Sequence, residues 1–179
     1  MHKQRKPPNP DALNPIPLFV IALIVFVVFA MAQYLGEDVP ATPEQELETA
    51  VLAYDLEGVQ IALAKGAQVN HRFPWLNYTV LHNAAWRGQT DIMDVLLEHG
   101  GNPNQRDSHA GETPLHAAVR GNNPAVVAQL LRAGADPNIA LQKESPQCIS
   151  GLVYPAGANA IDIARRAGYQ EVLAVLQSH

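Results

Sequence analysis

The chain has 179 residues, of which 47% are hydrophobic and 16% are charged, against roughly 25% charged residues in an average soluble domain. Its 12 Lys and Arg residues are outnumbered by 17 Asp and Glu residues, so the formal net charge is −5. This composition excludes a disordered protein made of highly charged sequence. Because the sequence has no cluster of basic residues, we expect no nucleic-acid partner. The single cysteine, Cys148, can form neither a disulfide within one chain nor a cysteine-based zinc cluster.

The first 35 residues have the pattern of a membrane-targeting segment. Residues 1–16 form a lead-in whose basic residues are Lys3, Arg5 and Lys6 and whose prolines prevent a regular helix. An apolar run follows, and the 20 residues from 16 to 35 would span about 30 Å as a helix. Basic residues precede the run but do not directly follow it, so the positive-inside rule predicts a cytoplasmic N-terminus. We therefore expect one transmembrane helix at residues 17–35, followed by a linker at 36–42.

A cleaved signal peptide is the alternative for this segment. Ala30 and Ala32 form an A-x-A pattern that could be cut before Gln33. The long lead-in and the length of the apolar run favour the uncleaved anchor, because a signal peptide needs an apolar core of only about 7 to 15 residues. The anchor would hold the C-terminal domain outside the cytoplasm, in the periplasm if the source is a bacterium. Cleavage near Ala32 would instead release a soluble periplasmic protein.

The rest of the chain, residues 43–179, repeats itself with a period of 34. Three series of identical residues share that spacing: Leu47, Leu81 and Leu115; Gly66, Gly100 and Gly134; Asn70, Asn104 and Asn138. The fourth copy is displaced by an insertion at residues 139–158, since Ile161 follows Leu115 by 46 positions, or 34 plus 12. Such a period is typical of a solenoid built from one supersecondary unit.

Each copy has the residues of a helix–turn–helix unit. In the third copy Thr113 is a candidate N-cap, Pro114 fits the first helical position, and His116 can reach back toward the cap. The same plan is repeated at residues 79–82, 159–162 and, in the first copy, 42–45. Between the two helices we expect left-handed residues at Gly88, Asn122 and Gly168. The second helices carry an apolar stripe: Met93, Leu96 and Leu97; Val127, Leu130 and Leu131; Leu173 and Leu176.

These segments resemble ankyrin repeats. The resemblance is strongest in TVLHNAAWRGQTDIMDVLLEHGGNPN at 79–104 and TPLHAAVRGNNPAVVAQLLRAGADPN at 113–138, with degenerate copies at 46–70 and 159–179. It implies an all-α ankyrin-repeat solenoid of about four units, preceded here by the transmembrane helix. It also implies a non-enzymatic scaffold that binds another protein, and structural histidines at His82 and His116 that hydrogen-bond between units.

Catalytic and metal-binding motifs are missing from the sequence. The seven histidines show no zinc-ligand spacing, and no phosphate-binding loop or nucleophile elbow occurs. We therefore expect no enzyme activity, no cofactor, no metal and no small-molecule substrate. A hydrolase that uses the insertion is the alternative from a different class. Cys148 in the insertion would be a packed thiol or would pair with another chain, and the insertion itself would bind a partner or be tolerated length.

The candidate partner-binding residues come from the few aromatic side chains. Trp75 and Tyr78 precede the first helix of the second unit, and Trp86 and Arg87 end it. In ankyrin repeats these places line the concave surface, and Glu112 and Arg120 match them one unit later. Trp, Tyr and Arg are enriched in interface hot spots. The alternative is that Trp75 and Trp86 only pack against each other.

We therefore expect a protein-binding ankyrin-repeat module displayed outside the cytoplasm from a single-span anchor. A more specific alternative is an inhibitor or immunity protein that neutralises a toxic enzyme in the periplasm.

Overall fold

The computed structural model describes residues 40–72, 78–146 and 153–178. Several sequence predictions fall on residues outside this description: the lead-in 1–16, the apolar segment 17–35, residues 36–39 of the linker, Trp75 and Cys148. None of the helices in the described part of the chain has the length and apolar character that a bilayer span requires.

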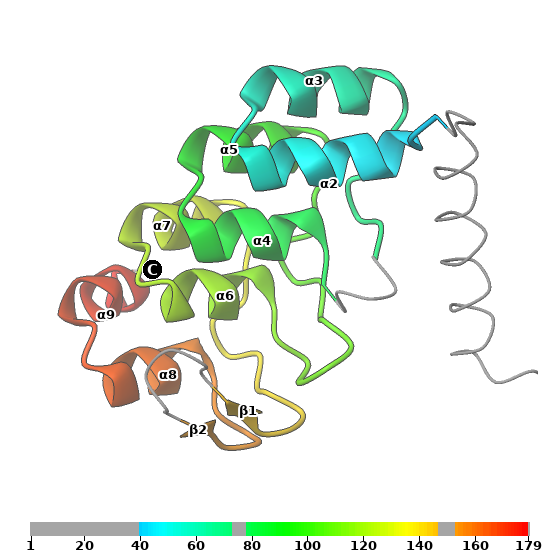
Figure 1. Ribbon diagram of the computed structural model, residues 1–179. Coiled ribbons are helices and arrows are strands. Elements are labelled where there is room, and N and C mark those ends of the chain that lie inside the picture. Colours follow the sequence, from blue (N-terminus) through cyan, green and yellow to red (C-terminus); the bar gives the residue numbers. More distant parts are fainter. Residues whose placement is uncertain (1–39, 73–77, 147–152, 179) are drawn as a thin grey trace, which may run out of the picture. The chain divides into compact units, whose positions relative to one another are not determined.

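The described residues form eight helices in four consecutive pairs. The pairs are α2 (Pro43–Ala53) with α3 (Leu56–Ala64), α4 (Val80–Arg87) with α5 (Thr90–Glu98), α6 (Pro114–Arg120) with α7 (Pro124–Arg132), and α8 (Ala160–Ala167) with α9 (Gln170–Gln177). The first helices of the pairs stack in one row and the second helices in another (Figure 1). The predicted all-α stack of four helix–turn–helix units is confirmed.

The start of each unit follows the predicted capping pattern. Thr42 accepts a hydrogen bond from the Gln45 backbone N–H at 3.3 Å, and Asn159 accepts one from Asp162 at 3.0 Å. In the second unit the Thr79 N–H donates to His82 Nδ1 at 3.3 Å. These bonds satisfy donors that the first turn of a helix cannot satisfy itself.

The core is built from the residues that recur at the 34-residue period. Leu47, Leu81 and Leu115 are at most 1% exposed. Small side chains such as Ala84 and Ala118 are fully buried beside them, which lets the first helices of neighbouring units approach closely. Because none of the helices within residues 40–178 that the structure describes exceeds 11 residues, the stability of the repeats has to come from this packing between units.

The predicted stripe on the second helices was partly wrong. Met93, Leu96, Val127, Leu130 and Leu176 are buried as expected, but Leu97, Leu131 and Leu173 are only half-buried. Ile92, Val126 and Val172 are buried in their place. The buried face of each second helix is therefore rotated about the helix axis relative to the prediction. It is centred nearer to Ile92, Val126 and Val172 than to the three half-buried leucines.

Recurrent asparagines connect the turns that follow the second helices. Asn70 Nδ2 donates to the Gly100 carbonyl at 2.9 Å and its Oδ1 accepts from the Asn102 N–H at 2.8 Å. Asn104 repeats both bonds with Gly134 and Asp136, at 2.9 and 2.8 Å. The 34-residue asparagine series thus satisfies the backbone of the next unit.

The insertion contains a short antiparallel hairpin, in which β1 (Ser145–Pro146) pairs with β2 (Val153–Tyr154). The residues just before β1 bond to the loop that precedes the third unit, because the N–H groups of Gln142 and Lys143 donate to the Ala110 carbonyl at 2.8 and 3.3 Å. Tyr154 on β2 is fully buried. The described residues of the insertion, 139–146 and 153–158, therefore pack against the repeat stack.

Candidate functional site

A pocket of about 310 Å³ lies between α4, α6 and the loop that joins α5 to α6. Its lining residues are Tyr78, His82, Asn83, Trp86, Arg87, Asp107, Glu112, Ala117 and Arg120. Five of the six predicted partner-binding residues are among them: Tyr78, Trp86, Arg87, Glu112 and Arg120. The sixth, Trp75, lies outside the described residues. The structure thus brings together side chains from two neighbouring units that the sequence could only align by period.

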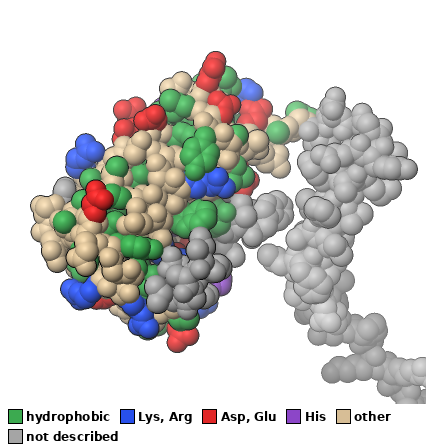
Figure 2. Space-filling model, turned by 60° about the vertical axis from the view of Figure 1, so that its left-hand side comes forward, with side chains coloured by type: hydrophobic (Ala, Val, Ile, Leu, Met, Phe, Trp, Pro, Cys, Tyr) green, Lys and Arg blue, Asp and Glu red, His purple; other side chains and the backbone are tan. Residues whose placement is uncertain are grey.

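The wall formed by α4 presents an aromatic and a cationic side chain. Trp86 is 46% exposed. Arg87 is held on two sides, because its Nε donates to Asn83 Oδ1 at 2.9 Å and its guanidinium lies 5.7 Å from the centre of the Tyr54 ring. Figure 2 shows hydrophobic and basic side chains adjoining near the middle of one face of the molecule. Such fixed aromatic and arginine side chains suit a protein interface.

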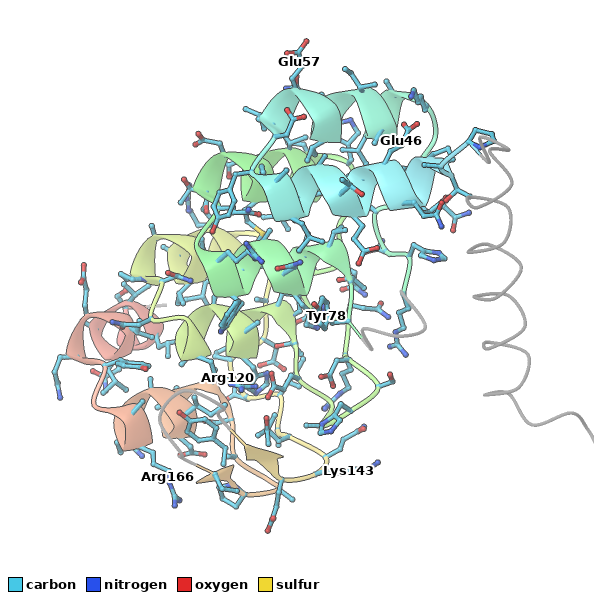
Figure 3. The ribbon with its side chains drawn as sticks, in the orientation of Figure 1. Glu46, Glu57, Tyr78, Arg120, Lys143 and Arg166 are labelled. Carbon is cyan, nitrogen blue, oxygen red and sulfur yellow. The ribbon has the colours of Figure 1, made fainter. Side chains whose placement is uncertain are left out.

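The opposite wall is a buried charged network. Arg120 Nη1 lies 2.5 Å from Glu112 Oε1 and 3.2 Å from Ser145 Oγ. The Ser145 hydroxyl also donates to Glu112. Figure 3 shows Arg120 below α6, on the side of the hairpin. Glu112 and Arg120 therefore form an ion pair with each other, and through Ser145 this pair connects the hairpin to the third unit.

The second carboxylate of the pocket is also engaged. Asp107 Oδ1 accepts the backbone N–H groups of Ala110, Gly111 and Glu112, at 3.1, 2.7 and 2.9 Å. These bonds hold the loop between α5 and α6 in one conformation. The Arg106 side chain also holds this loop, because its Nη1 donates to the Gly111 carbonyl at 3.0 Å.

Tyr78 lies just before the start of α4 and lines the pocket there (Figure 3). Partial burial, and then the nearby Glu48 carboxylate, raise the pKa of the Tyr78 hydroxyl. The hydroxyl is therefore protonated at neutral pH and can donate a hydrogen bond.

His82 connects the units as the ankyrin resemblance implied. Its Nδ1 accepts from Thr79, so Nε2 carries the proton and donates to the Glu112 carbonyl at 3.1 Å. Burial lowers the pKa of His82 to about 4. The side chain is neutral at pH 7 and acts as a structural hydrogen-bonding group.

His116 differs at its outer nitrogen. Its Nδ1 bonds to Thr113 in the same way, but its buried Nε2 makes no hydrogen bond of normal geometry among the described residues, and the backbone of Ile139 only partly offsets the lowering of its pKa by burial. Ala158 precedes the cap Asn159 as Glu112 precedes Thr113, so its carbonyl would be the equivalent acceptor. That carbonyl instead accepts the Leu141 N–H of the insertion at 2.8 Å.

The described part of the site has no catalytic arrangement. Within residues 40–72, 78–146 and 153–178, no three His, Cys, Asp or Glu side chains gather into a group that could hold a metal ion. The Ser145 hydroxyl contacts a carboxylate, but Ser145 is only 3% exposed, which leaves no access for a substrate. The geometry suits non-covalent binding.

Sequence reasoning missed several contributors to the site, among them Tyr54, Asn83, Asp107 and Ser145. Two of them had a usable signal. Tyr54 precedes Gly88 by one period of 34 and shares its left-handed backbone, with φ of 59° and 72°, and Asn83 precedes Arg87 by four residues, one turn of helix. Ser145 lies in the insertion, where no repeat predicts its position.

Comparison with known families agrees with this architecture. The family model described as ankyrin repeats (3 copies) matches residues 47–140, which is more than half of the chain. The chain belongs to the ankyrin-repeat family. Ankyrin repeats are generally non-enzymatic protein-interaction modules, so the chain is a protein-binding module of this class.

Several ankyrin-containing proteins are similar to this chain. BCL-6 corepressor-like protein 1 from Homo sapiens is 47% identical over 72 residues, which are 40% of this chain and 4% of that protein. An ankyrin repeat protein of Fowlpox virus (strain NVSL) is 34% identical over 122 residues, 68% of this chain and 33% of the viral protein. Rabankyrin-5 from Homo sapiens is 30% identical over 125 residues, 54% of this chain and 11% of the relative. The chain thus spans at most a third of these relatives.

Proposed function

We propose that this ankyrin-repeat chain binds another protein at the pocket between α4 and α6, with Tyr78, Trp86 and Arg87 as the principal contacts. The observation that carries the proposal is Trp86, a large aromatic side chain that is 46% exposed beside a 310 Å³ pocket and next to an arginine fixed by Asn83. Glu112 and Arg120, paired with each other, form the wall of the pocket that faces the hairpin. Trp75, which lies outside the described residues, stays a proposed contact on the basis of the sequence alone.

The proposal includes display of the repeat domain outside the cytoplasm from a single-span anchor at residues 17–35, in the periplasm of a bacterium. Its support is the unbroken apolar run at 18–32 and the basic residues Lys3, Arg5 and Lys6 ahead of it. A reporter enzyme fused after the last residue, active only outside the cytoplasm, tests this placement. Activity with retention in alkaline-washed membranes is expected, and a soluble form that begins at Gln33 would show cleavage.

Site-specific photo-cross-linking in the native host tests the binding site. A photoreactive amino acid at position 86 should cross-link a specific protein. The matched control is position 61 on α3, because Ile61 is 48% exposed, nearly the same as Trp86, but lies outside the pocket. The same partner cross-linked equally well from position 61, or no partner from position 86, would contradict the proposed site.

A further inference from the structure

The α4 wall of the pocket holds three side chains, Tyr78, Asn83 and Arg87, whose hydrogen-bond donors are not all used by the described residues. Among the described residues, the bonds of Arg87 account for its Nε and its carbonyl, and none is made by its terminal Nη nitrogens. Asn83 accepts from Arg87 through Oδ1, and within that part of the chain neither its Nδ2 nor the Tyr78 hydroxyl has a partner. All three side chains line the same pocket.

Arg87 has no ion-pair partner among the described residues. In the described part of the chain the ion pairs join Lys65 to Glu46, Arg120 to Glu112 and Arg165 to Asp162. Of the two pocket carboxylates, Asp107 accepts three backbone N–H groups and Glu112 pairs with Arg120. Among the described residues, the α4 wall is therefore a cationic donor surface without an ion-pair partner, and the carboxylate nearest to it in effect is Glu48, which acts on the Tyr78 hydroxyl.

The contacts of the Arg87 guanidinium also leave its terminal nitrogens available to a planar acceptor. The guanidinium carbon lies 5.7 Å from the centre of the Tyr54 ring and Nε donates to Asn83 Oδ1 at 2.9 Å. These two contacts restrict the side chain and leave its terminal nitrogens as a two-pronged donor. This geometry matches a carboxylate, which accepts two parallel N–H bonds from one arginine. Trp86 is the next residue and offers an exposed ring to an apolar neighbour of that carboxylate.

We infer that the pocket recognises an acidic side chain, Asp or Glu, that lies next to a bulky hydrophobic residue in a linear segment of the partner protein. The carboxylate accepts from Arg87 Nη, Asn83 Nδ2 and Tyr78 Oη, and the hydrophobic residue packs on Trp86. This inference rests on the proposed function and specifies its ligand.

Selection from a displayed library of random twelve-residue peptides tests the inference, with the full chain in detergent micelles as the target. We expect enriched peptides to carry Asp or Glu within two positions of Trp, Phe, Leu or Ile. Enrichment should be lost with Arg87→Gln and weakened with Arg87→Lys, which keeps the charge but not the fork. Arg132→Gln is the matched control, because Arg132 is exposed on α7 and outside the pocket.

Affinities of one enriched peptide and its Glu→Gln (or Asp→Asn) variant give the sharper measurement. The peptide substitution should weaken binding to the wild-type chain at least tenfold. It should weaken binding to the Arg87→Gln variant less than twofold, because that variant has already lost the cation with which the peptide carboxylate pairs. No enriched family, families without an acidic residue, or families that need a free C-terminal carboxylate would overturn the inference. If acid-free peptides bind and Trp86→Ala abolishes their binding, the proposed function survives and the carboxylate inference fails. If neither Trp86→Ala nor Arg87→Gln affects binding, both fail.

Discussion

The junction between the second and third units and the junction between the third and fourth units start from nearly the same sequence but bond differently. At the first junction, His82 donates to the Glu112 carbonyl, and the turns are joined by Asn104, which bonds to Gly134 and Asp136. At the second, the insertion intervenes and His116 Nε2 makes no hydrogen bond of normal geometry among the described residues. There the hairpin supplies other bonds, from Ser145 to the charged pair below the pocket. A repeat motif therefore predicts contacts only where the next unit follows at the same spacing.

Acidification should produce the largest effect, because both junctions contain a buried neutral histidine. Burial lowers the pKa of His82 and of His116 to about 4, whereas an unfolded histidine has a pKa of about 6.5. As the pH falls below about 6.5, the unfolded chain takes up protons that the folded chain takes up only near pH 4. The free energy of unfolding should thus fall over this window by up to about 3 kcal/mol per histidine.

Urea unfolding at a series of pH values between 7.5 and 4 measures this loss. The double variant His82→Gln, His116→Gln should have a clearly flatter profile than the wild type. An equally steep profile in the double variant would show that the loss arises from other groups.

Core leucines should be equally important at both junctions, because the apolar spacing is unaffected by the insertion. Leu96→Ala and Leu130→Ala remove fully buried side chains and should each lower the free energy of unfolding by about 2 to 5 kcal/mol. The half-buried neighbours Leu97 and Leu131 are the matched controls, and their substitution by Ala should cost distinctly less. Equal losses for the neighbours would contradict the rotated buried face.

The charged network at the interrupted junction should have an intermediate effect. Arg120→Met leaves the buried Glu112 carboxylate without its cation and should cost about 2 kcal/mol, less than for a completely buried pair because the Arg120 side chain is 17% exposed. The amides of Gln142 and Lys143, which bond to Ala110, should exchange with solvent faster. Lys65→Met breaks the exposed pair with Glu46 and serves as the control, with an expected loss below about 1 kcal/mol. Equal losses would mean that the network does not hold the hairpin.

The smallest expected effect separates the two histidines at neutral pH. His82→Ala removes the cap bonds and the bond to the next unit, whereas His116→Ala removes only the cap bonds. At pH 7.5 we therefore expect His82→Ala to be more destabilising by about 1 kcal/mol. Urea midpoints measured side by side decide this, and a larger loss for His116→Ala would reverse the comparison.

The parts of the structure that follow from local rules could be predicted from the sequence. Caps such as Thr42 and turns such as Asn122, with φ of 54°, depend on a few neighbouring residues and a backbone conformation. The alignment of Trp86 and Arg120 around one pocket followed from the repeat period, which converts sequence spacing into spatial proximity.

The parts that depend on the insertion could not be predicted. No periodicity relates Ser145 to Glu112, so the network below the pocket is visible only in three dimensions. The different bonding of His116 has the same cause, since Leu141 of the insertion donates to the Ala158 carbonyl. The rotation of the buried face on α5 and α7 depends on how each second helix packs against two neighbours, which a stripe of leucines does not specify.

The most direct test of the account is to measure partner affinity and folding stability on the same Trp86→Ala variant, with the protein cross-linked from position 86 as the partner. Trp86 is 46% exposed, so the free energy of unfolding should change by less than about 1 kcal/mol, while loss of an interface hot spot should weaken binding by about 2 to 4 kcal/mol, or roughly 30- to 800-fold. Unchanged affinity, or a loss of affinity matched by a loss of folding stability, would contradict the pocket between α4 and α6 as the partner-binding site.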